Sequence, residues 1–301
     1  MSVLTATRTT ARPPAWARRQ ARYSAGSQLS RAVMVLMAIY FLLPFWWLVV
    51  AATKDNDHLT NSTPLWFSKL SLGSNLRELF EQQNGIYLRW LVNTVIYAVV
   101  SGVGATAIAA AAGYAFAKLD FPGRRFLFSV LLGLIMVPAT ALVLPTYLIM
   151  SKIGLTDTMW SVILPSLLNP FGVYLLRIYA HDSVPDEMLE AARVDGASEY
   201  RIFRSIAIPV MKPALVTVLL FTMVTTWNNF FLPLVMLSND HLFPLTVGLR
   251  GWYQSATIGN GGQALFNVVL IGALVAIIPL IIAFLLLQRY WRGGLTVGSI
   301  R

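Results

Sequence analysis

Residues that commonly perform catalysis or bind metals are few in this chain and lie far apart. The three histidines, His58, His181 and His241, fall in separate predicted loops, so no pair has the spacing of a metal-binding helix. No Gly-x-Ser-x-Gly turn presents a nucleophilic serine, and no lysine follows a glycine, which excludes a Walker-type phosphate loop. The chain has no cysteine, so disulfides and thiolate metal sites are excluded as well. We therefore predict a protein that is not an enzyme and that carries no metal and no cofactor of its own.

Charge is concentrated in one stretch, EAARVDGASEYRIFRSIAIP, which covers residues 190–209 and brings six charged side chains into a hydrophobic chain. The residues just before it predict a short helix that begins near Val184. Ser183 and Asp186 have the spacing of a capping box, and Pro185 suits a first helical turn.

The same stretch contains residues that end one helix and begin another. Gly196 is placed to stop the first helix in a left-handed C-cap, and Ser198 is placed to cap a second short helix. Pro209 is expected to close that second helix. We predict a helix, a tight turn and a helix. Because isolated helices of this length are marginal in water, the pair needs a surface to pack on.

Three interpretations of this helical pair are open on its residues alone. A DNA-binding helix-turn-helix has the same outline, but six acids against five basic residues in the loop 177–212 disfavour contact with phosphate. The pair can instead lie on its own membrane domain as an interfacial loop. In the third interpretation it is a docking element for a soluble partner, where Ala191 and Ala192 permit close approach and Gly196 sets the angle between the helices.

The elements around this stretch are predicted membrane spans. The chain has 301 residues, of which 56% are hydrophobic and 12% charged, outside the usual composition of a soluble domain. Six long runs contain no Asp, Glu, Lys, Arg or His, and about 20 helical residues cross a bilayer core of about 30 Å. We expect an all-α integral membrane protein with six transmembrane helices. The runs cover residues 32–52, 90–117, 126–150, 159–176, 213–237 and 264–287.

The distribution of Lys and Arg predicts the side of the membrane on which each loop lies. The N-terminal tail, the turn 118–125, the loop 177–212 and the C-terminal end hold 17 of the 23 basic residues. Because cytoplasmic loops are enriched in Lys and Arg, both termini and the charged loop are predicted to be cytoplasmic. The same bias accounts for the net charge of +10, so no binding of nucleic acid is expected. We interpret residues 1–31 as a disordered basic cytoplasmic tail and residues 32–301 as the membrane domain.

Small and amide residues are the notable features within the spans. A four-residue repeat of small residues that ends at Gly113 allows close packing of a neighbouring helix, from this chain or from a partner. In the sequence WNNFFLPL, Trp227, Asn228 and Asn229 lie at membrane depth, where amides bond a neighbouring helix or line a polar path for a substrate. No span carries an ionisable side chain, so the coupling group of a proton-driven or sodium-driven carrier is missing.

The charged stretch resembles the EAA motif of the membrane subunits of ATP-binding-cassette (ABC) importers, whose general form is Glu-Ala-Ala, a glycine a few residues later, and then Ile-x-x-Pro. Ile208, where relatives usually have leucine, is a departure. The resemblance implies a coupling helix in the loop 177–212, between the fourth and fifth spans, that transmits motion from an ATPase. The positions that match the motif, in order, are Glu190, Ala191, Ala192, Asp195, Gly196, Ile206 and Pro209.

Further stretches are similar to carbohydrate-importer permeases of the maltose-permease G type, and the similarity covers about residues 30–301. The segment RIYAHDSVPDEM departs from the family, because it lacks the usual Arg-Gln-aromatic run. The resemblance implies the type I ABC importer fold and transport of a sugar or oligosaccharide. The similar stretches are AGYAFAKLDFPGRR, VPATALVLPTYLIMSKIGLTDT, WNNFFLPLVML, FPLTVGL and QRYWRGGLTVGSIR.

The resemblance also implies partners and a location. A second homologous permease would supply the other half of the pathway, two ABC ATPase subunits would bind ATP and Mg, and an extracytoplasmic solute-binding protein would deliver the solute. The binding protein is expected at the loop 238–263, with its glycine-rich GNGGQ segment. The chain would cross the plasma membrane of a bacterium or archaeon and contact its lipid. Two alternatives stay open: an ABC importer permease for a non-sugar solute, and a channel or carrier that works without an ATPase.

Overall fold

The computed structural model describes residues 15–258 and 265–291, and every regular element within those ranges is a helix. In this part of the chain, five helical segments are long and apolar enough to cross a membrane, and a bent pair of helices supplies a sixth crossing when it is counted as one span. This arrangement confirms the predicted all-α membrane fold.

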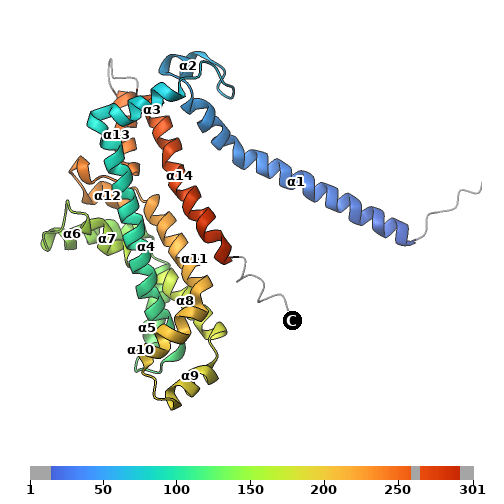
Figure 1. Cartoon of the computed structure of the whole chain (residues 1–301), viewed down its shortest axis with the longest axis vertical. Coiled ribbons are helices and arrows are strands. Elements are labelled where there is room, and N and C mark those ends of the chain that lie inside the picture. Colours follow the sequence, from blue (N-terminus) through green and yellow to red (C-terminus); the bar gives the residue numbers. More distant parts are fainter. Residues whose placement is uncertain (1–14, 259–264, 292–301) are drawn as a thin grey trace, which may run out of the picture.

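The first span lies in α1 (Ala15–Ala52), which leaves the rest of the molecule at an angle and meets it only near its C-terminal end (Figure 1). Since α1 begins at Ala15, part of the segment 1–31 that we expected to be disordered is helical, while residues 1–14 lie outside the described ranges. Pro44 is accommodated within this helix, as expected for a span. Two short helices follow, α2 (Asn56–Asn61) and α3 (Leu72–Glu81).

The centre of the molecule is α4 (Ile86–Lys118), which follows the short turn η1 (Gln82–Gly85) and packs against α8 (Pro170–Ser183) and α11 (Ile208–Trp227) (Figure 1). The predicted packing of small residues is made within this chain. A Cβ added at Gly113 would lie only 2.9 Å from the backbone nitrogen of Arg177 in α8, so α4 and α8 approach closely because glycine stands there.

The third predicted span is not one straight helix. It consists of α5 (Arg124–Ile135), the turn η2 (Ala139–Leu142) and α6 (Val143–Lys152), with a bend of 100° between α5 and the segment that follows. Pro138 lies at the bend. Proline has no backbone N–H and disfavours a helical residue before it, which explains why the helix stops here rather than running through.

The fourth and fifth predicted spans are also interrupted. The fourth comprises α7 (Trp160–Ser166) and α8, so it ends seven residues later than the predicted residue 176. The fifth ends at Trp227 and is followed by a separate short helix, α12 (Phe231–Met236). The remaining elements are η4 (Asp240–Leu242), α13 (Leu245–Ile258) and the last span, α14 (Phe266–Trp291), which tolerates Pro279.

Candidate functional site

The charged loop folds as a helix, a turn and a helix, as predicted, at the end of the molecule opposite α3 and α13 (Figure 1). Its helices are α9 (Asp186–Val194) and α10 (Glu199–Ile202). The start of α9 differs from the expectation near Val184. Ser183 is the last residue of α8, so the predicted capping box does not form, and Pro185 takes the N-cap position instead.

The turn between α9 and α10 depends on Gly196, whose φ of +80° is in the left-handed region. The Gly196 N–H donates to the carbonyl of Arg193 at 3.0 Å, and the Ala197 N–H donates to the carbonyl of Ala192 at 2.9 Å. These two bonds form the Schellman C-cap that glycine favours. Ser198 then caps α10 by accepting a backbone N–H at 3.4 Å. The predicted capping roles of Gly196 and Ser198 are therefore confirmed.

Pro209 does not close the second helix, which corrects the prediction. α10 continues through a wider π-helical turn, η3 (Phe203–Ala207), directly into α11, and Pro209 lies in the first turn of α11. The Ile208 N–H bonds to the carbonyl of Phe203, five residues back. Proline cannot supply the N–H that an α-helix needs at its position, but it is tolerated where a helix is re-formed after an irregular turn.

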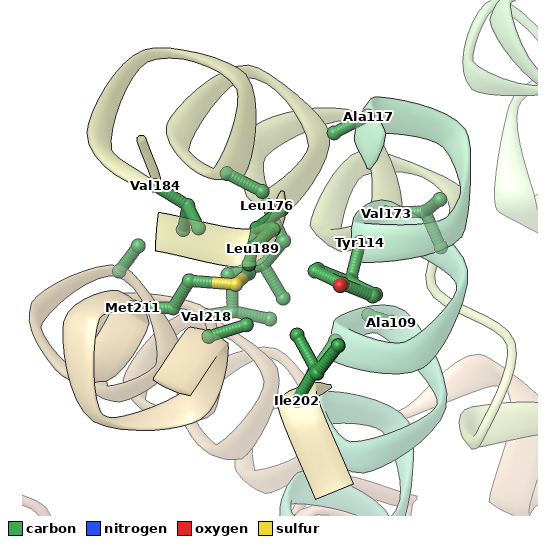
Figure 2. Close-up of a cluster of buried hydrophobic side chains, with 14 residues drawn as sticks. Ala109, Tyr114, Ala117, Val173, Leu176, Val184, Leu189, Ile202, Met211 and Val218 are labelled. Atoms are coloured by element: carbon green, nitrogen blue, oxygen red, sulfur yellow. The ribbon is translucent and has the colours of Figure 1, made fainter. Parts of the chain in front are cut away.

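One face of the loop is buried against this chain's own spans. Leu189 of α9 and Ile202 of α10 are 1% and 0% exposed and point into a cluster formed with α4, α8 and α11 (Figure 2). Figure 2 shows Tyr114 of α4 beside them. This packing supplies the surface that the two short helices require, as the interfacial-loop interpretation anticipated. It also connects the loop mechanically to three spans.

The opposite face of the loop is exposed and mixes charge with apolar groups. Val194 is 87% exposed and Tyr200 is 69% exposed, which is unusual for large hydrophobic residues next to water. Exposed apolar groups rimmed by charges are typical of a protein interface. Of the motif residues, Ala192 and Ile206 are partly buried in the cluster beneath, and the others are exposed: Glu190, Ala191, Asp195, Gly196 and Pro209.

Two ion pairs fix the loop in place. The Lys118 ammonium at the end of α4 lies 2.7 Å from the Asp186 carboxylate, and it holds the pKa of that carboxyl below its usual value. Within the loop, Arg193 Nε donates to Glu199 Oε1 over 2.6 Å and so joins α9 to α10 across the turn. The predicted site residues did not include Lys118, Leu189 or Ile202. Leu189 was detectable as an apolar residue inside a polar stretch. Nothing in the sequence indicated that Lys118 lies near the loop of α9 and α10.

The second candidate site, at Trp227, Asn228 and Asn229, coincides with the break between α11 and α12. Trp227 is buried among other hydrophobic side chains, whereas Asn228 is exposed. The Asn228 amide donates to the carbonyl of Val224 in its own helix at 2.8 Å. The Asn229 carbonyl accepts from the Thr246 hydroxyl at 2.8 Å, which ties the break to α13. Asn228 is thus the member of this group that is available to another molecule.

A pocket of about 240 Å³ lies between α4, α11 and α14, and its lining is apolar. Trp227 and Pro279 contribute to it. Such a lining offers no hydrogen bonds to a polar solute. No group of three or more His, Asp or Glu side chains suited to a metal ion occurs within the described ranges.

Comparison with known proteins gives a consistent result. The family model described as "binding-protein-dependent transport system inner membrane component" matches residues 102–293. The chain is 34% identical to the arabinooligosaccharides transport system permease protein AraQ of Halalkalibacterium halodurans, over 90% of this chain and 94% of that protein. It is 26% identical to the lactose transport system permease protein LacG of Rhizobium radiobacter, over 90% of this chain and 94% of that one.

The fold is also shared with a solved structure, a bacterial ABC transporter involved in the import of the acidic polysaccharide alginate. The match has a TM-score of 0.78 and covers 89% of this chain and 97% of that chain, at 23% sequence identity. This likeness shows that the bent and interrupted helices described above belong to a known membrane architecture.

Proposed function

The chain belongs to the family of binding-protein-dependent transport system inner membrane components, and from this membership we propose that it forms half of the translocation pathway of an ATP-driven carbohydrate importer. As a family member it is a multi-pass plasma-membrane protein and a transport subunit, not an enzyme. The observation that supports the proposal most is the loop of α9 and α10, which has one face buried against three spans and the other face exposed.

The loop is proposed as the coupling element that meets an ATPase subunit. Its exposed motif residues, with Val194 and Tyr200 beside them, suit a partner cleft that accepts apolar side chains within a charged rim. Leu189 and Ile202 pack directly on α4, α8 and α11, so a displacement of the loop moves those spans as a body. In this proposal ATP and Mg are bound by two ATPase subunits, and this chain holds neither.

A second permease subunit is proposed to complete the pathway. Most of α1 and much of the bent pair α5 and α6 expose large apolar side chains. Contact of these surfaces with a second permease and with membrane lipid would cover them, which supports the proposal. Both termini and the coupling loop are proposed to be cytoplasmic, as the basic residues indicate. An extracytoplasmic solute-binding protein is proposed to approach the opposite end. The GNGGQ segment expected to meet it lies outside the described ranges.

The proposed solute is a sugar or oligosaccharide. The relatives named above are permeases for arabinooligosaccharides and lactose, which supports this class. Within the pathway, the exposed amide of Asn228 at the break between α11 and α12 is the proposed polar contact. Asn229 shapes the break through its bond to Thr246, and the buried Trp227 is proposed to support the helix end rather than touch the solute.

Affinity purification of the full chain from mild detergent tests the proposal. Recovery of an ABC ATPase and of a second permease in stoichiometric amounts is the expected result. Recovery of the chain alone, with transport activity on its own after reconstitution, would identify a channel or carrier instead. Stimulation of the complex's ATP hydrolysis by a non-sugar solute, and by none of the sugars tested, would contradict the carbohydrate assignment.

A further inference from the structure

The segment between α12 and α13 is fixed through its main chain by one face of α4. Trp90, Asn93 and Tyr97 donate to the carbonyl oxygens of the three successive residues of η4 (Asp240–Leu242), each over 2.8 Å. The Thr94 hydroxyl, on the same face, accepts the N–H of Leu245 at 2.8 Å. Four neighbouring side chains of one helix thus hold the main chain of this segment.

The same segment is held from a second side by Asp157, in the turn between α6 and α7. One oxygen of its carboxylate accepts the N–H of Ser238 at 2.8 Å and the N–H of Asn239 at 2.9 Å. Because the main chain of this loop is already fixed, a ligand that binds its side chains does not have to order the loop backbone.

The side chains that this loop presents are Asp240 and His241. Both residues are exposed, and within the described ranges neither side chain makes a hydrogen bond or an ion pair. They line a hollow of about 600 Å³ together with Gln83, Asn84 and Arg89. Arg89 uses only its Nε for a bond to a loop carbonyl, at 3.3 Å, so its terminal nitrogens remain available.

Another part of the lining of the hollow is a strained turn in η1. Gln83, Asn84 and Gly85 have φ values of 48°, 58° and 78°, three left-handed residues in succession. For residues other than glycine this conformation costs energy, and it persists where the surrounding structure enforces it. The Trp252 indole N–H donates to Gln83 Oε1 at 3.0 Å and so helps to enforce it. Strained backbone of this kind clusters at ligand sites.

We propose that this hollow binds a carbohydrate on its way into the pathway, an inference that rests on the proposed transport of sugars. Sugar hydroxyls both donate and accept hydrogen bonds. Arg89 offers donors and Asp240 offers acceptors, while His241 and the Asn84 amide offer both. The Gln83 amide, whose oxygen already accepts from Trp252, adds donors. The guanidinium and the carboxylate compensate each other's charge, which favours a neutral polyol over an ion. The volume is within the range of roughly 300–1,000 Å³ of small-molecule sites.

The position of the hollow fits an entry site. It lies at the end of the molecule that carries α3 and α13, which the proposed orientation places on the extracytoplasmic side. From η4 the chain leads back through α12 to the break at Asn228, the proposed polar contact deeper in the pathway. A solute released at the outer face would meet the hollow before that break.

Titration calorimetry on the full chain in lipid nanodiscs tests this site, with arabinotriose, lactose and trehalose as the probes. We expect saturable binding of at least one probe. Asp240→Ala and His241→Ala should each weaken it about tenfold, the loss expected for a hydrogen bond to a charged or strongly polar group. Gln254→Ala is the matched control, because Gln254 is an exposed polar residue on α13 outside the hollow, and it should bind as the unchanged chain does.

Absence of saturable binding for all three probes, or equal binding by the two variants and the unchanged chain, would overturn the proposal. Variants that bind the sugar normally but associate less with the solute-binding protein would identify a protein-docking surface and would also overturn it. The importer proposal is tested separately, by recovery of the ATPase and the second permease without any sugar. Failure of the entry site is therefore distinguishable from failure of the proposed function.

Discussion

Lys118 and Asp186 connect the last turn of α4 to the first turn of α9, with 2.7 Å between Nζ and Oδ1. The Lys118 side chain is 4% exposed, and its ammonium also donates to the carbonyl of His181 at 3.3 Å. A nearly buried cation with two acceptors is expensive to leave unpaired. The pair is therefore a direct link between the central span and the proposed coupling helix.

Asp186→Asn should weaken this link while keeping the size of the side chain. We expect uptake by the complex to fall several-fold, with normal assembly, because α9 no longer moves α4 through a charged contact. Uptake at matched protein levels is the measurement. Glu81→Gln is the control, since it removes an exposed ion pair with Arg77 in α3, at the other end of the molecule, and should leave uptake unchanged. Equal uptake by both variants would show that the Lys118 contact does not contribute to coupling.

The Asp157 carboxylate should give the loop 237–240 an acid-sensitive stability. The N–H groups of Asn239 and Ser238 lower the pKa of Asp157, so its contribution is complete above the ordinary carboxyl pKa of about 3.9 and is lost as the pH falls through the lowered value. Asp157→Asn should lower Tm at pH 7, and the difference should shrink as the pH falls below about 4. Thermal unfolding between pH 3 and pH 7 measures this, and a pH-independent difference would contradict the assigned cause.

Gly196→Ala should distort the turn between α9 and α10. The φ of +80° costs a residue with a Cβ about 1–2 kcal/mol, although no atom lies within 4 Å of the added Cβ. Asparagine tolerates this conformation better, so Gly196→Asn should lose less stability and less uptake than Gly196→Ala. Gly73→Ala, in the helix α3 and equally free of contacts, should be neutral or stabilising. If Gly196→Ala left both Tm and uptake as little changed as Gly73→Ala does, the left-handed turn at Gly196 would be shown to contribute to neither stability nor transport.

Replacing both Asn228 and Asn229 by Leu should impair uptake and leave the ATPase bound. The exposed Asn228 amide is the proposed contact to the solute, and the break lies far along α11 from the coupling loop. Uptake and recovery of the ATPase by affinity purification are measured on the same preparation. Unchanged uptake would show that neither residue contacts the solute and that both serve only in helix packing.

The sequence predicted the helical membrane class, the approximate positions of the apolar spans and the turn at Gly196, because these depend on local composition and on single residues with strong conformational preferences. It did not predict the bend of 100° at Pro138 or the continuation of α10 past Pro209. Proline interrupts a helix in the first case and is absorbed by a π-turn in the second. Neighbouring helices decide between these outcomes, and a single sequence does not reveal them.

Only part of each candidate site was predictable from the sequence, because a single sequence does not reveal which distant segments pack together. The motif residues from Glu190 to Gly196 were detectable as a pattern, since they are contiguous in the chain. The Lys118 contact spans 68 residues, and the hollow near Asp240 joins segments about 150 residues apart. Such contacts arise from the packing of α4 against α8 and against the segment before α13, which sequence spacing does not encode.

A single introduced thiol tests the coupling role of the loop most directly, because the chain contains no cysteine. Val194→Cys lies at the exposed end of α9, and Ser238→Cys is an exposed control at the other end of the molecule. In the isolated chain both thiols should react with a maleimide at similar rates. In the complex with the ATPase subunits, we expect Val194→Cys to be protected from the maleimide while Ser238→Cys reacts as before. Equal reactivity of Val194→Cys with and without the ATPase would show that α9 does not contact the ATPase and would exclude the coupling role.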